Sequence, residues 1–296
     1  MSSLEAKTAN YFYLLVLLLL STIGGYVQGK NIFLGLVTTE FGFILIPVVL
    51  YLLIKGHDMG KILKVRKLEF RHALMAIPLA LVGWLVSEAI TIIWVFLVGK
   101  WIAVPANPIP VPWDGRTFAL EIATVGFTAA LCEELFFRGF FMTAYEGWGS
   151  GRAIVMSGIF FALLHVNPGA LPGIAFLGVL LAYSAYRTGS VFMSMIMHFV
   201  YNFISIVVMK LGGSAEQSGS IPVEAFIAWI ILGAIAFLIL LKMVKRLKAT
   251  TTPEYKPAWS DTGTFLRHSI AHWPMLISFI FIIGQMAFMS LLKILN

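Results

Sequence analysis

Five ionisable residues that suit acid–base chemistry fall at helical spacing inside apolar stretches of the sequence. With their neighbours they make three short patterns: Glu133, Glu134 and Arg138; then Phe161 and His165; then His198 and Asn202. A carboxylate can take a proton from water, and imidazole or amide N–H groups can stabilise a developing negative charge. The same groups also suit proton-coupled transport, so the residue types alone leave hydrolysis and transport open.

The spacing of the first pattern separates its two acids. Glu134 and Arg138 are four residues apart with the acid first, which is the favourable order for an ion pair on a helix. Glu133 points about 100° away around the helix. No cation in its own segment can pair with it. We therefore predict that Glu133 is the acid available for chemistry, whereas Glu134 and Arg138 support it.

The other two patterns place further polar groups on helix faces. His198 and Asn202 are four residues apart, so their side chains share one face. Phe161 lies one turn before His165, where its ring can pack against the imidazole. We predict that Phe161 holds His165 in place.

The composition indicates that these groups lie in a membrane. Of the 296 residues, 59% are hydrophobic and 12% are charged, against about 25% charged in a typical soluble chain. The mean hydropathy is +0.91. A bilayer-spanning helix needs about 20 apolar residues. The sequence contains nine runs of roughly this kind: 11–27, 32–54, 73–99, 118–145, 153–166, 170–186, 191–209, 222–244 and 270–295. We predict an all-α, polytopic transmembrane bundle of about eight to nine helices.

Depth along these helices supports a single site. With a rise of 1.5 Å per residue, Glu133 and His165 lie roughly 20 Å, and His198 roughly 15 Å, from the nearest loop on one side of the membrane. The 153–166 run is short, and the breaker Asn167-Pro168-Gly169 closes it. Ionisable groups are rare in membranes and usually functional, so their agreement in depth favours a site over coincidence.

The net charge of +7 reflects topology. Lys and Arg in short loops mark the cytoplasmic side. Two loops on the same side carry most of the cations: Lys55, Lys61, Lys64, Arg66, Lys67 and Arg71 in one, and Lys242, Lys245, Arg246, Lys248, Lys256 and Arg267 in the other. We expect an integral protein of the cell membrane with a cytoplasmic N-terminus, and we expect no nucleic-acid partner. The loop 101–113 contains Pro105, Pro108, Pro110 and Pro112 and should be extended.

Three further acids lie in apolar runs. Glu40 and Glu88 are each alone in their runs, and for both we favour a structural or lining role over catalysis. Glu121 lies near the expected start of a helix, where a carboxylate favours the helix dipole, and we assign it no role. The single cysteine, Cys132, excludes an intrachain disulfide.

The three patterns together resemble the signature of the CPBP family of intramembrane proteases. That family includes the type II CAAX prenyl endopeptidases and bacteriocin-processing and immunity-type members. Its signature is Glu-Glu-x-x-x-Arg, then Phe-x-x-x-His, then His-x-x-x-Asn or Asp. The sequence matches it without departure, over about 117–209. The resemblance implies three parts: N-terminal helices in 1–116, a catalytic membrane core in 117–211 and C-terminal helices in 212–296.

The resemblance also implies a mechanism. Glu133 would act as general base on a water molecule with help from His165, and His198 with Asn202 would hold the oxyanion. The substrate would be a membrane-embedded or lipidated peptide or protein, with prenylation as one option. Zinc bound by Glu133, His165 and His198 is an alternative, as in a metalloprotease. A metal-free mechanism explains Asn202 better, because asparagine is a poor zinc ligand.

Two other function classes remain. The first is a non-catalytic membrane scaffold or bacteriocin-immunity factor on the same fold, because some members of the resembled family act without cleavage. The second is a proton-coupled transporter, which Glu40 and Glu88 would support. Transporters commonly show repeated halves with broken helices. The sequence shows no such repeat, so the transporter is the weaker hypothesis.

Overall fold

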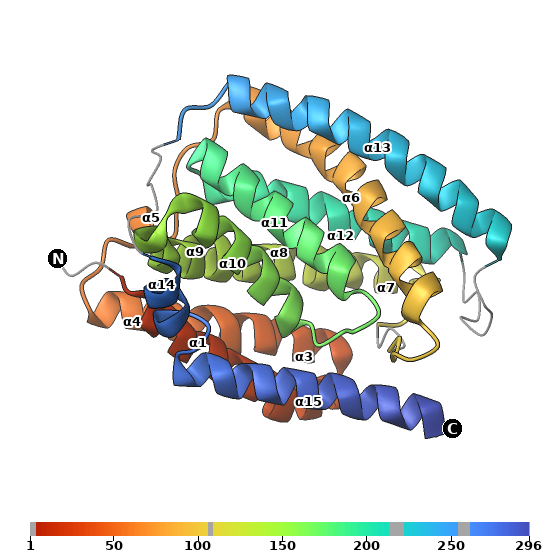
Figure 1. Ribbon diagram of the computed structural model, residues 1–296, viewed down its shortest axis with the longest axis horizontal. Coiled ribbons are helices and arrows are strands. Elements are labelled where there is room, and N and C mark those ends of the chain that lie inside the picture. The colour runs from red at the N-terminus through yellow and green to blue at the C-terminus, as the bar shows by residue number, and fades with distance from the viewer. Residues whose placement is uncertain (1–3, 106–108, 213–221, 254–260, 296) are drawn as a thin grey trace.

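The computed structural model is a bundle of helices that run in alternating directions (Figure 1). It describes residues 4–105, 109–212, 222–253 and 261–295. No strand occurs within these ranges. Six helices are long and apolar enough to cross a membrane: Ala6–Lys30, Ile32–Ile54, Phe70–Val98, Val191–Gly212, Val223–Ala249 and Trp273–Leu295. The predicted all-α membrane bundle is confirmed.

The three remaining apolar runs are helical as well. Residues 115–145 form one continuous helical stretch, and two shorter helices, α10 (Ser150–Leu164) and α11 (Leu171–Thr188), follow it. Helix α10 ends before Asn167-Pro168-Gly169, as the breaker predicted. Each of the nine apolar runs is thus a helix in the described part of the chain.

The elements follow one another in a simple order. The N-terminal pair comprises α1 (Ala6–Leu19), η1 (Leu20–Gly24), α2 (Gly25–Lys30), α3 (Ile32–Thr38), η2 (Thr39–Leu45) and α4 (Ile46–Ile54). The middle comprises α5 (Met59–Ile62), α6 (Phe70–Val98), α7 (Gly115–Glu121), η3 (Ile122–Thr128), α8 (Ala129–Glu134), η4 (Leu135–Phe141), α9 (Met142–Tyr145) and η5 (Glu146–Trp148). After α10 and α11 come α12 (Val191–Gly212), α13 (Val223–Ala249), α14 (Thr262–His268) and α15 (Trp273–Leu295).

Four of these segments, η1 to η4, are π-helical. A π-helical turn is wider than an α-helical one and often lies at functional sites, because it changes the direction in which side chains leave the helix. Segments η3 and η4 flank α8, which carries Glu133 and Glu134. The helix that holds both acids is therefore irregular on either side of them.

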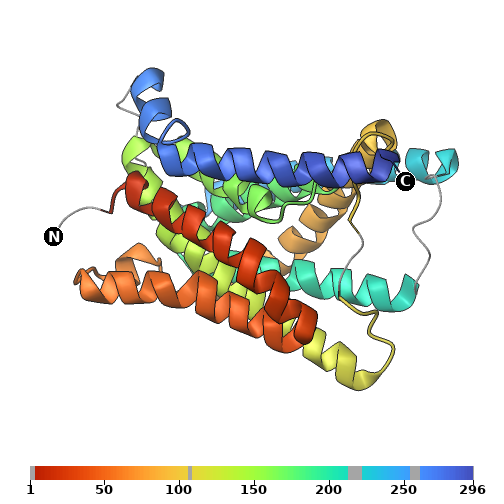
Figure 2. The ribbon, with the colours of Figure 1, turned by 90° about the horizontal axis from the view of Figure 1, so that it is seen from below.

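Helix packing places the 115–145 stretch inside the bundle. Helix α6 packs against α11, α12 and α13, and α10 packs against α11. The stretch contacts α12 through η3 and α8, and contacts the N-terminal pair through η2. Helix α15 packs along α1 on the opposite face, as Figures 1 and 2 show. The first and last spans thus lie side by side although they are far apart in the sequence.

The outer surface of the bundle is apolar. In each of the six long spans, at most 33% of the most apolar stretch is buried within the protein. Large hydrophobic side chains such as Leu34, Ile280 and Ile283 are exposed. Polar groups such as Glu134 and Arg138 are fully buried instead. This inside-out distribution suits a lipid environment, where the helices satisfy the backbone hydrogen bonds.

The loops that carry the basic residues gather at one end of the bundle, on the left in Figure 1. Lys64 pairs with Glu146 at 2.5 Å between Nζ and Oε1. The Arg187 guanidinium donates through Nε to the Thr251 hydroxyl at 3.0 Å. The loops before α6 and after α13 therefore share one end, as the even number of intervening spans predicted. Lys256 lies outside the described residues.

The opposite end holds the proline-containing loop, whose residues 101–105 and 109–113 form no helix or strand. Pro108 lies outside the described residues. Lys210 donates to the Pro112 carbonyl at 3.0 Å, which ties this loop to α12. The expectation that Glu121 lies near a helix start is wrong. Asp114 caps α7, which begins at Gly115, so Glu121 is the last residue of α7 and lies beyond its first turn.

Candidate active site

The carboxylate of Glu134 joins two elements of the site. Its Oε1 accepts a hydrogen bond from Arg138 Nη1 at 2.6 Å, and both side chains are fully buried. Arg138 also donates through Nη2 to the Gly178 carbonyl of α11 at 3.0 Å. The ion pair predicted from the four-residue spacing is therefore confirmed, and it also anchors α11.

The same oxygen of Glu134 accepts a hydrogen bond from His198 Nδ1 at 2.8 Å. The helical spacing of the sequence did not reveal this contact, because His198 lies on another helix, α12. An ionised carboxylate only accepts hydrogen bonds, so Nδ1 carries the proton. The other ring nitrogen, Nε2, lies 3.7 Å from Glu133 Oε2. Glu134 thereby sets the orientation in which His198 meets Glu133.

Phe161 is the packing centre of the site. Its ring lies edge-on to His165, with ring centroids 4.8 Å apart, and edge-on to His198 at 5.6 Å. The Arg138 guanidinium carbon lies 4.3 Å from the centroid of the same ring. The predicted packing of Phe161 on His165 is confirmed. The ring also contacts two residues that the sequence pattern did not link to it.

His165 lies at the C-terminal end of α10, where the helix stops. Its Nδ1 lies 2.8 Å from the Phe161 carbonyl, a backbone acceptor, so Nδ1 carries the proton. In the neutral ring Nε2 is then free of hydrogen and can accept a proton. The side chain is exposed and lines a cavity. His165 is the histidine that faces open space, whereas His198 is buried behind Glu133.

Asn202 faces the helix that carries Glu133. Its Nδ2 donates to the Val125 carbonyl of η3 at 2.8 Å. This bond uses one of the two amide hydrogens and fixes the carboxamide relative to α8. Glu133 and His165 line the cavity, whereas Asn202 and His198 do not.

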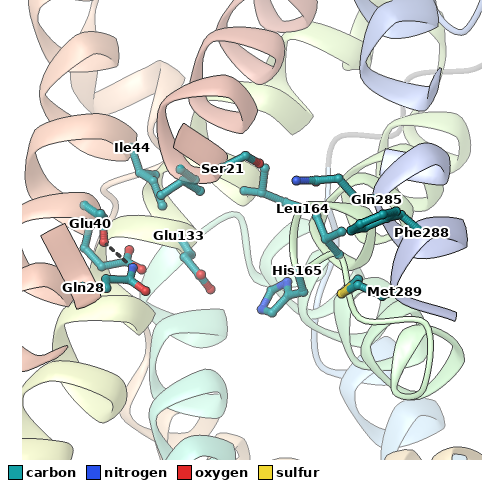
Figure 3. Close-up of a pocket in the computed structure, with 13 residues that line it drawn as sticks. Ser21, Gln28, Glu40, Ile44, Glu133, Leu164, His165, Gln285, Phe288 and Met289 are labelled. Carbon is teal, nitrogen blue, oxygen red and sulfur yellow. Dashed lines mark hydrogen bonds between the residues drawn. The ribbon is translucent and has the colours of Figure 1, made fainter. Parts of the chain in front are cut away.

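A cavity of about 580 Å³ lies beside Glu133. Figure 3 shows Glu133 and His165 on either side of it. The rest of its wall comes from the first two spans and the last one: Leu20, Ser21, Gln28, Thr39, Glu40, Ile44, Leu164, Val166, Gln285, Phe288 and Met289. Helix α15 and the N-terminal pair therefore complete a cavity that α8 and α10 begin.

Glu40 is the second carboxylate of this cavity, and the sequence favoured a structural or lining role for it over catalysis. It is 7% exposed and lies on η2, and the expected lining role is confirmed. The position of Glu40 in an apolar run was the signal in the sequence that marked it as a candidate. Nothing in the sequence indicated that it lies beside Glu133. Glu88, in contrast, does not line the cavity. It accepts a hydrogen bond from the Tyr201 hydroxyl, with 3.3 Å between the two oxygens.

The donor set does not suit a resident metal ion. Among the residues that the structure describes, no three His, Cys, Asp or Glu side chains are grouped so that they could hold one. Nδ1 of His198 is already hydrogen-bonded to Glu134. The ring of His165 faces the cavity from the end of a different helix. We therefore derive no step through zinc.

Comparison with known protein families matches residues 115–204 to the family described as Type II CAAX prenyl endopeptidase Rce1-like. This range contains every residue of the three patterns. The match covers about a third of the chain and supports membership of the CPBP family. A comparison with curated proteins gives no match, and neither does a comparison with solved structures. The family supports intramembrane proteolysis of the CAAX type as the kind of function. The N-terminal pair and α15, which complete the cavity, lie outside the matched range.

Proposed function

We propose that this CPBP member is an intramembrane endopeptidase that hydrolyses a peptide bond of a membrane-embedded or lipidated substrate without a metal ion. One observation carries the proposal: Glu133 lies between the cavity and the buried chain of His198, Glu134 and Arg138. The acid that faces the cavity thus has a fixed, hydrogen-bonded support behind it.

The first step is attack by water on the scissile carbonyl. Glu133 takes a proton from a water molecule in the cavity, and the water oxygen attacks the carbonyl carbon. His165 faces the same cavity with Nε2, so it can orient that water or accept a proton from it. A base held in a water-poor cavity within a fixed framework suits this task.

The second requirement is stabilisation of the oxyanion. His198 in its protonated form donates through Nε2 while Nδ1 stays bound to Glu134. Asn202 keeps one amide hydrogen that Val125 does not use. Fixed donors of this kind act where negative charge develops in the transition state. The proton that Glu133 took then passes to the amide nitrogen, the C–N bond of the tetrahedral intermediate breaks, and the amine and the new carboxyl group are released.

The test uses purified protein in lipid nanodiscs with a library of membrane-tethered peptides, and mass spectrometry detects cleavage. We expect Glu133→Gln to lower the cleavage rate by about 10²- to 10⁴-fold, which is the usual contribution of a general base. Glu88→Gln serves as the matched control, because Glu88 is an intramembrane acid that does not line the cavity. Equal cleavage by the wild type and Glu133→Gln would contradict the proposal, whereas no cleavage of any peptide by the wild type would favour a scaffold or immunity role.

A further inference from the structure

The cavity beside Glu133 is acidic. Two carboxylates, Glu40 and Glu133, contribute to its wall, and neither lysine nor arginine is among the residues that line it. Figure 3 shows both on the same side of the cavity, opposite Gln285 of α15. A group that enters this space meets two acids and no basic side chain from Lys or Arg.

Glu40 has a buried oxygen without a partner. Oε2 of Glu40 is shielded from solvent and forms no hydrogen bond with any described residue. The residue as a whole is 7% exposed. Burying a carboxylate without a compensating partner is costly, so such groups are normally paired. The partner of Glu40 is then expected to come from outside the chain.

The neutral residues of the cavity add acceptors to this acidic wall. Oε1 of Gln285 is also buried and unpartnered. His165 gives its Nδ1 hydrogen to Phe161, so Nε2 of the neutral ring accepts. Two donors of the wall are engaged within the chain: Thr39 donates to the Leu36 carbonyl, and Gln28 donates to Thr39. The cavity therefore offers several acceptors that a ligand rich in N–H donors can use.

We propose that Glu40 binds a cationic side chain of the substrate, and that the enzyme selects membrane-associated peptides with a lysine or arginine close to the scissile bond. This inference rests on the proposed function, because the bound peptide is a substrate only if the protein cleaves it. Lys and Arg carry a charge and several N–H donors on long apolar stems. The apolar wall of Leu20, Ile44 and Phe288 suits such a stem, while Glu40 takes its charged end.

The family match does not include Glu40. Glu40 lies on η2, outside the range 115–204 that carries the family match. Glu133 lies within the matched range, and Glu40, from outside that range, supplies a second carboxylate to the same cavity. A cation on Glu40 would place the neighbouring peptide bond near Glu133, because both acids line one cavity.

The test measures binding, so it does not depend on cleavage. A short palmitoylated peptide with one central lysine is compared with the same peptide carrying Nε-acetyl-lysine, by fluorescence anisotropy in nanodiscs. Mass spectrometry checks that the peptide stays intact. We expect the wild type to bind the lysine peptide at least about tenfold more tightly, since loss of a buried charge partner is costly. In Glu40→Gln this ratio should fall to about one, while Glu88→Gln keeps it.

Two results would overturn the inference. The first is equal binding of both peptides by the wild type, which is the outcome if Glu40 holds a proton and stays neutral. The second is a preference that survives in Glu40→Gln. Failure of the proposed function looks different: the lysine peptide binds selectively, yet neither peptide nor any member of the library is cleaved.

Discussion

His198 donates its Nδ1 hydrogen to Glu134 Oε1 at 2.8 Å, although the two residues lie on different helices and 64 positions apart. Glu134 is thus more than the ion-pair partner of Arg138. It decides which nitrogen of His198 carries the proton and which nitrogen faces Glu133. A carboxylate behind an imidazole fixes its tautomer and its orientation.

Substitution of Glu134 by glutamine should therefore impair catalysis through His198. A carboxamide can donate to Nδ1 and so favour the opposite tautomer. We expect kcat to fall by about 10²-fold or more, with a smaller change in KM, because the acid–base geometry is lost. The double variant Glu134→Gln with Arg138→Met removes the unpaired charge and serves as the stability control. If this double variant recovered both folding and wild-type kcat, Glu134 would have no positioning role.

Removal of the Arg138 charge should destabilise the fold. Arg138 and Glu134 are fully buried, so Arg138→Ala leaves an uncompensated carboxylate inside the bundle. We expect a loss of about 3 to 5 kcal/mol in the free energy of unfolding. The control is Arg71→Ala, since the Arg71–Glu69 pair is exposed by about 60% and such pairs contribute about 0 to 1 kcal/mol. Denaturant titration in detergent compares the two, and equal losses would contradict the assignment.

The crossing of α10 and α11 should not tolerate a side chain at Gly178. A Cβ at this position would lie 2.6 Å from the Gly158 carbonyl oxygen. The Gly178 carbonyl also accepts the hydrogen bond from Arg138. We expect Gly178→Ala to cost about 1 to 3 kcal/mol through overpacking. Gly25→Ala is the control, because no atom lies within 4 Å of a Cβ there. Thermal unfolding in detergent measures both, and an unchanged midpoint for Gly178→Ala would refute the close packing.

Cleavage should survive removal of metal ions. The described His, Cys, Asp and Glu side chains include no group of three that could hold one. We expect full activity after dialysis against a strong chelator, with zinc, cobalt and iron far below one ion per chain by elemental analysis. Loss of activity that zinc restores would instead show that Glu133, His165 and His198 come together around a metal.

The orientation in the membrane can be tested with single cysteines. The native Cys132 is fully buried, so it should stay silent towards a membrane-impermeant maleimide. Lys67 lies in the first basic loop, and Trp113 is 65% exposed at the opposite end. In sealed right-side-out vesicles we expect Trp113→Cys to be labelled and Lys67→Cys to be protected. The reverse pattern would show that the N-terminus faces outward.

The sequence by itself determined the parts of this protein that depend on local order. Apolar length predicted the helices, because a bilayer sets the length of a spanning segment. Charge placement predicted that the two basic loops share one end. Four-residue spacing predicted the Glu134–Arg138 pair and the contact of Phe161 with His165, since residues on one helical turn are neighbours whatever the surroundings.

Only the tertiary structure decided which groups meet across helices. Nothing in the spacing linked His198 to Glu134, or Asn202 to Val125, because each contact joins two helices whose rotation depends on their packing. The same holds for Glu40, which η2 brings to the cavity of Glu133. In a membrane, polar side chains find partners inside the bundle, and long-range packing and π-helical turns determine which partners lie within reach.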